Sequence, residues 1–150
     1  MNAISNTSLF FVAFLGMEGV AYLTHKYLMH GSLWCLHKSH HRPRRGLFEL
    51  NDLFGVFFSL PSIALIYVGV NHYPPLLWLG LGMTAYGAVY FVFHDVIVHR
   101  RIRLSYRAKS RYMKRIIRAH WIHHSTRERD GAVSFGFIYA PPVETLRSGR

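Results

Sequence analysis

Cysteine is nearly absent from this sequence, since Cys35 is the only one among 150 residues. A single cysteine excludes an internal disulfide and the paired-cysteine motifs of redox and zinc proteins. If the chemistry of the protein needs electrons, another protein must supply them. A cleavable signal peptide is not expected either, because no basic residue precedes the first apolar run.

Lysine and arginine are missing from residues 1–25 and 46–99. All eighteen of these cations lie in residues 26–45, which hold five, and in residues 100–150, which hold thirteen. The net charge of +11 therefore comes from two basic regions rather than from a generally basic surface. Basic proteins often bind nucleic acid, but basic regions that flank apolar runs are typical of the cytoplasmic side of membrane proteins. We therefore favour a membrane protein.

Three apolar runs alternate with these basic regions. Residues 8–23 contain Glu18 as their only charged residue, and residues 53–70 and 76–93 contain none. Eighteen helical residues reach about 27 Å, close to the roughly 30 Å of a bilayer core. We predict an all-α, integral-membrane helical bundle of three to four spans in a single domain, residues 1–150. Three of the spans are predicted at residues 5–24, 53–70 and 76–93.

The charge distribution also predicts the topology. The histidine-rich regions 25–52 and 94–131 contain most of the cations and are expected on the cytoplasmic side. The N-terminus and the tight turn at residues 71–75, which contains two prolines, are expected on the outer side. Residues 132–143 are apolar but too short to cross a bilayer. They could form a fourth, interfacial or re-entrant, segment.

Ten of the eleven histidines fall into four short motifs. Two motifs have the spacing His-x4-His and two have the spacing His-x2-His-His. In chain order they are His25 with His30, His37 with His40 and His41, His94 with His99, and His120 with His123 and His124. Only His72, in the outer turn, stands apart. Charge and histidine position agree in predicting a histidine-rich cap on the cytoplasmic side.

The spacing within each motif limits what its histidines can bind. Residues i, i+3 and i+4 share one face of an α-helix, so each His-x2-His-His motif can present three imidazoles to one place. Residues i and i+5 diverge by about 140°. The histidines of a His-x4-His motif therefore reach either two different metals or one metal at a helix end where the geometry relaxes. Ten imidazoles exceed the ligand positions of one ion, and two metal ions fit the number.

A single His-x2-His-His motif is more often a polar helix face than a metal site, but four motifs on one side of a membrane favour metal binding. Imidazole binds zinc, copper, iron and nickel alike. Oxidation of a lipid-dissolved substrate with O2 needs a redox metal, which zinc is not. We favour a di-iron centre over a zinc or nickel transporter, whose ligands are expected near the middle of its spans.

The sequence also resembles a known family. The order of the four motifs is similar to that of the membrane fatty-acid hydroxylase superfamily. From about residue 16 to residue 142, the surrounding segments resemble bacterial-type β-carotene 3-hydroxylases. These segments include GMEGVAYLTHKYLMHG, ELNDLF, GMTAYG and SFGFIYAPP.

The resemblance implies hydroxylation of carotenoid β-ionone rings, from β-carotene through β-cryptoxanthin to zeaxanthin, at a non-haem di-iron centre that uses O2. It implies all ten motif histidines as iron ligands, and electrons from ferredoxin and ferredoxin reductase. It also implies a multi-pass position in the cell inner membrane, with the active site on the cytoplasmic side. A carotenoid ketolase, a ring 2-hydroxylase, and a fatty-acyl or sterol hydroxylase are alternatives with the same chemistry.

Four polar residues near the motifs are candidates for supporting the metal centre. Asp95 either orients an imidazole through its second nitrogen, or caps a helix or pairs with Arg100 or Arg101. Glu49, Asn51 and Asp52 precede the second span, and Asn51 or Asp52 is predicted to cap it. Support of a histidine is the alternative for all three.

Other residues have expected roles outside the metal centre. Glu18 lies in an apolar helix, and we expect a packing role for it. Aromatic residues of the spans could line a tunnel for a polyene, although simple packing is their more common role; they are Tyr67, Tyr86, Tyr90 and Phe93. The basic clusters at residues 42–45 and 100–118 are expected to attract an acidic ferredoxin.

Overall fold

The structure of the chain, a computed structural model, describes residues 3–43 and 46–148. Every regular element in these residues is helical, and the all-α prediction is confirmed for them. Elements η1 and η3 are π-helical and η2 is a 3₁₀ turn. In chain order the elements are α1 (Ala3–Leu23), η1 (Thr24–Ser32), α2 (Trp34–His37), η2 (Leu50–Asp52), α3 (Leu53–Asn71), α4 (Pro75–Tyr90), η3 (Phe91–Val98), α5 (Arg111–His124) and α6 (Val143–Ser148).

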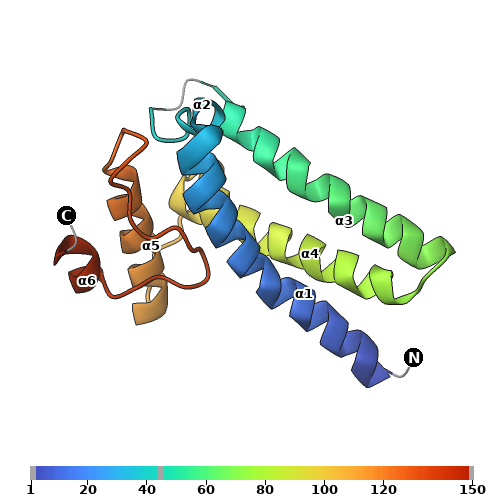
Figure 1. Cartoon of the computed structure of the whole chain (residues 1–150). Helices are drawn as coiled ribbons and strands as arrows, with labels where there is room; N and C mark the ends of the chain where they lie inside the picture. Colours follow the sequence, from blue (N-terminus) through green and yellow to red (C-terminus); the bar gives the residue numbers. More distant parts are fainter. Residues whose placement is uncertain (1–2, 44–45, 149–150) are drawn as a thin grey trace.

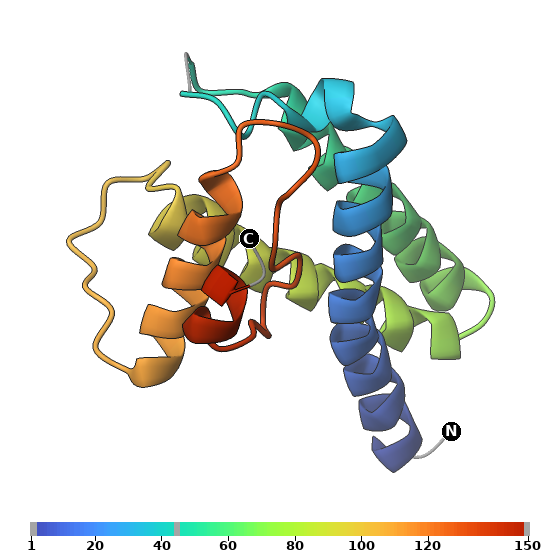
Figure 2. The same ribbon diagram turned by 60° about the vertical axis from the view of Figure 1, so that its left-hand side comes forward.

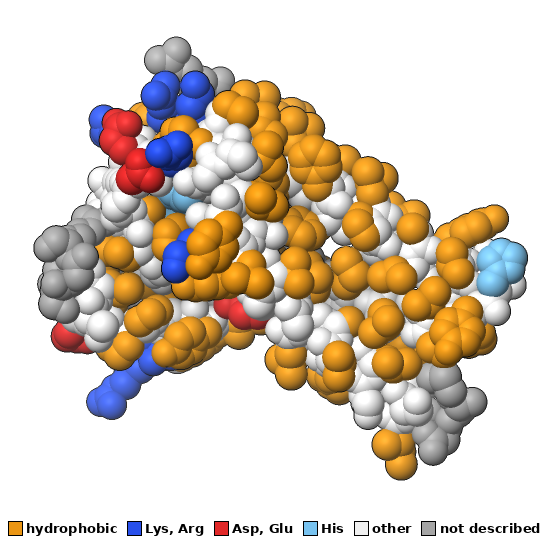
Figure 3. Space-filling view, viewed as in Figure 1, with side chains coloured by type: hydrophobic (Ala, Val, Ile, Leu, Met, Phe, Trp, Pro, Cys, Tyr) orange, Lys and Arg blue, Asp and Glu red, His pale blue; other side chains and the backbone are white. Residues whose placement is uncertain are grey.

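Three helical segments are long and apolar enough to cross a membrane, and they contain the three predicted spans: Ala3–Ser32, Leu50–Asn71 and Pro75–Val98. Large apolar side chains cover their outer surface, where the side chains of Leu15 and Ile63 are each more than half exposed. Figure 3 shows this apolar surface over the spanning helices, whereas most of the Lys, Arg, Asp and Glu side chains visible in that view lie at the other end of the molecule. An apolar exterior of this extent fits a lipid environment.

The molecule has a helical bundle and a cap joined at one end of the bundle (Figure 1). Helix α4 packs against both α1 and α3. The N-terminus and the α3–α4 turn lie away from the cap. The cap contains α2, the segment that precedes α5, and α5 and α6 with the loop that joins them. The two histidine-rich regions therefore meet at the same end of the bundle, as the predicted topology requires.

Small residues let α4 approach its neighbours closely. A Cβ atom at Gly82 would collide with the backbone of Phe10 in α1, and one at Gly80 would collide with Ile66 in α3. The Ser62 hydroxyl of α3 also donates to the Gly80 carbonyl oxygen at 2.9 Å. Close approach with an interhelical hydrogen bond is typical of helix packing in membranes.

The turn between α3 and α4 is as tight as predicted. The backbone N–H groups of His72 and Tyr73 both donate to the Val68 carbonyl oxygen, at 2.8 and 2.9 Å. Pro75 then begins α4, in a position where its missing N–H costs nothing.

Glu18 fixes the chain after α5 to the spanning helices. Its Oε1 atom accepts the backbone N–H groups of Phe137, Ile138 and Tyr139 at 2.6, 2.8 and 3.1 Å. Its Oε2 atom accepts the Tyr86 hydroxyl of α4 at 2.7 Å. One carboxyl group thus joins α1, α4 and a distant loop, and the predicted packing role of Glu18 is confirmed.

Residues 132–142 form a loop without regular structure. In Figure 2 the chain between α5 and α6 crosses from the end of α5 toward α1 before it returns to α6. No span is found in this part of the chain among the residues that the structure describes. The loop covers the histidines instead, because the Phe135 ring lies 5.5 Å from the His25 ring and the Phe137 ring lies 5.4 Å from the His94 ring.

We expect Glu18→Ala to destabilise the protein, because three backbone N–H groups lose their common acceptor. Each unsatisfied buried donor costs about 1–3 kcal/mol, so thermal unfolding in detergent should begin several degrees lower. Glu18→Gln keeps one oxygen for the same donors and should lose much less. Equal melting temperatures for the wild type and Glu18→Ala would contradict this role.

Candidate metal centre

Ten histidine side chains converge where η1, α2, η3 and α5 meet. The described residues contain three groups of histidines whose ligand atoms lie within 4.8 Å of one another. We call the two larger groups site A and site B, and the third joins His41 to His123 of site A and His124 of site B. Site A contains His25, His30, His37 and His123, and site B contains His40, His94, His99, His120 and His124. We add His41 to site A because its Nε2 atom lies 3.2 Å from that of His37, although its ring also lies 4.4 Å from the His124 ring of site B. All ten motif histidines are thus brought together, while His72 lies apart at the end of α3.

Within each site the Nε2 atoms of different histidines face one another. Four such distances, of 3.2, 3.2, 3.0 and 2.9 Å, join His25 to His37, His30 to His123, His40 to His94, and His99 to His120. Two nitrogens that each lie about 2.1 Å from one metal ion are about 3.0 Å apart at a right angle and about 3.4 Å apart at the tetrahedral angle. The observed spacing therefore fits histidines that share a metal ion.

The contacts of Nδ1, the ring nitrogen that faces away from the site, show which nitrogen of the imidazole carries the proton. Four Nδ1 atoms lie 2.7–3.0 Å from backbone carbonyl oxygens, in the pairs His25 with Phe135, His30 with Arg129, His41 with Thr126 and His123 with Val133. A carbonyl oxygen can only accept, so Nδ1 donates, and in a neutral imidazole Nε2 keeps a free lone pair. Lone pairs that face one another repel unless a cation lies between them. The donor set itself therefore fits a metal.

Burial favours the neutral form of four histidines of the cap at pH 7, by lowering their pKa. It lowers the pKa of His41 to about 4, and with nearby histidines it lowers the pKa of His37 and of His124 to about 2. It also holds the pKa of His123, which has no exposed surface, well below the usual value. A neutral imidazole is the form that binds a metal.

Both His-x4-His motifs lie on π-helical segments. His25 and His30 lie in η1, and η3 contains His94, whose carbonyl oxygen accepts the N–H of His99 at 2.9 Å. Hydrogen bonds from residue i+5 to residue i bring side chains five positions apart onto one face. The ring centroids are therefore only 5.3 Å apart for the first pair and 4.5 Å for the second. Each pair serves one site, which the sequence left open.

Each His-x2-His-His motif contributes to both sites, so the prediction that it presents three imidazoles to one place is wrong. The first motif gives His37 and His41 to site A and His40 to site B, and the second gives His123 to site A and His120 and His124 to site B. Helix α5 contributes histidines to both sites, and α2 is a single turn that ends at His37. The residues after His37 therefore do not continue an α-helix.

The predicted capping of the second span is replaced by other contacts. The Oδ1 atom of Asn51 accepts from His37 Nδ1 at 2.7 Å, and no side chain caps the start of α3. Asp52 caps η2 instead, because its Oδ2 atom accepts the N–H of Glu49 at 2.9 Å. Asn51 thus contacts a candidate ligand, whereas Asp52 pairs with Arg101 at 2.6 Å.

Asp95 has the ion-pair role considered for it, because its Oδ1 atom lies 2.9 Å from Arg101 Nε. It lies 3.5 Å from His94 Nδ1, which forms no hydrogen bond with it. A supporting role was considered for Glu49 together with Asn51 and Asp52, and its Oε2 atom lies 3.0 Å from His40 Nδ1. No sequence signal could identify the backbone carbonyl oxygens of residues 126–135 as acceptors, because every residue has one.

A cavity of about 660 Å³ connects the spanning helices with both sites. Apolar and aromatic residues of α1, α3 and α4 form most of its wall, and His25 of site A and His94 and His120 of site B line it at the cap. Tyr86 and Tyr90 line the cavity, as considered from the sequence, whereas Tyr67 and Phe93 do not. Such a cavity suits an apolar ligand that reaches the histidines from the membrane.

We expect the purified protein to bind two metal ions per chain at pH 7, one in each site. His37→Ala should remove the ion of site A and His94→Ala that of site B, so each variant should retain about one ion by elemental analysis. His72→Ala, at the far end of the bundle, is the control and should retain two. Two ions in all three variants would contradict the assignment of these histidines as ligands.

Comparison with known proteins points to one family. The fatty acid hydroxylase family matches residues 10–141. The chain is similar to the β-carotene hydroxylase of Pantoea ananas, with 50% identity over 145 residues that cover 97% of this chain and 83% of that protein. It is 47% identical over 134 residues to the β-carotene hydroxylase of Paracoccus sp. (strain PC1), covering 89% of this chain and 83% of that one. It is also 38% identical over 133 residues to the chloroplastic β-carotene 3-hydroxylase 2 of Arabidopsis thaliana, covering 86% and 43%. No solved structure gives a significant match.

Proposed function

Because this chain belongs to the fatty acid hydroxylase family, we propose that it hydroxylates the β-ionone rings of carotenoids with O2 at a di-iron centre held by its ten motif histidines. The expected sequence is β-carotene to β-cryptoxanthin to zeaxanthin. The substrate class follows from relatives that are about half identical over nearly the whole chain. Five histidines around each of two sites supply the ligands.

The cavity is the structural observation that carries this proposal. It is apolar along α1, α3 and α4 and ends at histidines of both sites. A hydrocarbon dissolved in the membrane can enter between the spanning helices and place one end ring at the metal centre without crossing water. The aromatic rings of Phe135 and Phe137, which also line the cavity, exclude water from the reacting ring.

The reaction requires a redox partner. Hydroxylation converts R–H, O2, two electrons and two protons into R–OH and water, so each ring hydroxylated consumes two electrons. Iron held by these histidines would supply the activation of O2, which zinc could not because it has no accessible redox change. The chain has no second cysteine to pair with Cys35 as a redox carrier. The electrons therefore come from another protein, which we infer to be a ferredoxin supplied by its reductase.

A second cleft, of about 360 Å³, gives this partner access to site B. It is lined by His99, His120 and His124, and Trp121 stands beside them with 62% of its surface exposed. The other exposed residues on this face of α5 include Arg111, Lys114 and Arg118. A cationic helix face that ends at the metal centre suits an acidic electron donor.

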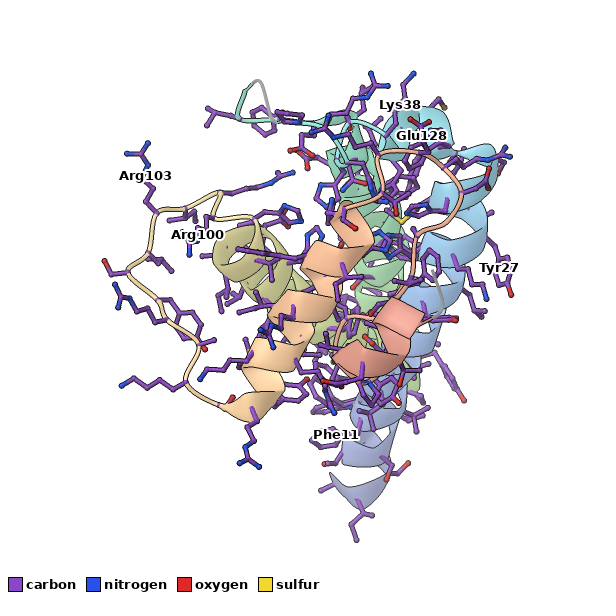
Figure 4. The ribbon with its side chains drawn as sticks, turned by 90° about the vertical axis from the view of Figure 1, so that its left-hand side faces the viewer. Phe11, Tyr27, Lys38, Arg100, Arg103 and Glu128 are labelled. Atoms are coloured by element: carbon purple, nitrogen blue, oxygen red, sulfur yellow. The ribbon has the colours of Figure 1, made fainter. Side chains whose placement is uncertain are left out.

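The charge distribution supports an orientation. The cap contains nearly all the cations, and Arg100 and Arg103 project from the segment before α5 (Figure 4). We infer that the cap lies on the cytoplasmic side of the cell inner membrane, where a soluble donor can reach the second cleft.

Product analysis tests the function. In a host that accumulates β-carotene, the wild-type chain should yield zeaxanthin, with β-cryptoxanthin as the intermediate. His124→Ala should yield neither, because site B loses a ligand. Keto or 2-hydroxy carotenoids from the wild type would instead identify a ketolase or a ring 2-hydroxylase.

Charge reversal tests the donor surface. Arg118→Glu should slow turnover driven by an acidic ferredoxin by about tenfold at low salt, while turnover driven by a small chemical reductant stays unchanged. Lys26→Glu is the matched control, because Lys26 packs beside Tyr27 on the opposite side of the cap from Arg103 (Figure 4). Equal slowing by both variants, or no dependence on salt, would contradict docking at α5.

A further inference from the structure

The two sites differ in the groups that accept hydrogen bonds from their histidines. In site A every accepting group is a neutral amide oxygen. The Nδ1 atoms of His25, His30, His37, His41 and His123 bond the carbonyl oxygens of Phe135 and Arg129, the side-chain oxygen of Asn51, and the carbonyl oxygens of Thr126 and Val133, all within 2.7–3.0 Å. None of these five accepting groups carries a formal charge.

In site B one ring bonds a carboxylate and a second lies near one. His40 Nδ1 donates to Glu49 Oε2 at 3.0 Å, whereas His94 Nδ1 lies 3.5 Å from Asp95 Oδ1 without forming a hydrogen bond. These side chains are largely shielded from water, with exposures of 10% for Glu49 and 14% for Asp95. Their charges are therefore screened less than charges on an open surface.

Arg101 holds both carboxylates in place. Its Nε atom lies 2.9 Å from Asp95 Oδ1, and its Nη2 atom lies 3.6 Å from Glu49 Oε2 and 2.6 Å from Asp52 Oδ1. The Arg101 guanidinium thus bridges η2 and η3. Asp52 lies in η2, Glu49 directly precedes it, and Asp95 lies in η3. These contacts place one guanidinium among three carboxylates beside site B.

A carboxylate behind an imidazole acts differently from a carbonyl group. It polarises the Nδ1–H bond further, so the opposite nitrogen becomes a stronger base and a better electron donor to a metal. Net negative charge nearby also stabilises a cation more as the charge of that cation increases. Both effects act on site B and are weaker in site A.

We propose that the two metal sites are unequal: site B, backed by Glu49 and Asp95, binds its cation more tightly than site A. The higher oxidation state of a redox metal is correspondingly favoured in site B. Arg101 is a positioning residue, because it keeps two mutually repelling carboxylates behind His40 and His94 without touching a ligand nitrogen. This inference rests on the proposed function only in taking the ten histidines as metal ligands.

Release of cobalt tests the inequality without any turnover. The full-length protein in detergent is loaded with two equivalents of Co²⁺, and an excess of chelator is added while the visible absorption of the bound ion is followed. Two phases of equal amplitude are expected, a fast one from site A and a slow one from site B. A single phase in the wild type would overturn the proposal.

Matched isosteric variants assign the phases. Glu49→Gln keeps the shape and a hydrogen-bond acceptor but removes the charge, and it should accelerate the slow phase about 10- to 100-fold. Asn51→Asp adds a carboxylate behind His37 and should slow the fast phase. Arg101→Leu should accelerate the slow phase, with partial recovery in Arg101→Lys.

Glu49→Gln should accelerate cobalt release and Asn51→Asp should slow it, so general loss of folding cannot imitate the expected result. If Glu49→Gln accelerates both phases equally, or if Asn51→Asp leaves the fast phase unchanged, the proposal is wrong. Single-phase release from a protein that still converts β-carotene to zeaxanthin would refute the inequality and leave the function intact. Two-phase release from a protein that forms no hydroxylated product would support the inequality and contradict the proposed function.

Discussion

The structure depends on hydrogen bonds from the outer nitrogens of six imidazoles to fixed oxygens. Where the acceptor is a carbonyl group, the bond fixes the tautomer and points the free lone pair of Nε2 inward. Nε2 atoms about 3 Å apart are unfavourable unless they share a cation. Metal binding, ring orientation and folding of the cap therefore depend on one another, because the same hydrogen bonds fix the loops and orient the imidazole rings.

The loop after α5 is what completes the centre. It supplies carbonyl oxygens to four site A rings, and Phe135 and Phe137 line the substrate cavity. Glu18 holds this loop against α1 through three backbone N–H groups. A charged residue in an apolar helix, costly by itself, is thus explained by the loop it anchors. The centre and its route to the membrane are built by the same segment.

Helix type explains why motif spacing misled the assignment of rings to sites. An α-helical His-x4-His motif would spread its rings, but η1 and η3 are π-helical and bring each pair together. The His-x2-His-His motif of α5 does share one face, yet that face serves both sites. A pattern of spacings predicts which side chains lie near each other on one element. It does not predict what stands opposite them.

The sequence alone determined the all-helical fold, the three apolar spans, the tight turn at residues 71–75 and the ten histidines brought to one end, because each depends on local composition or short spacing. Only the tertiary structure decided how the histidines divide between two sites, that Glu49 supports His40, and that residues 132–142 form an irregular loop over the histidines. The physical reason is separation along the chain: His25 and its acceptor Phe135 are 110 positions apart. Their pairing follows from how the cap packs on the bundle, which no local pattern records.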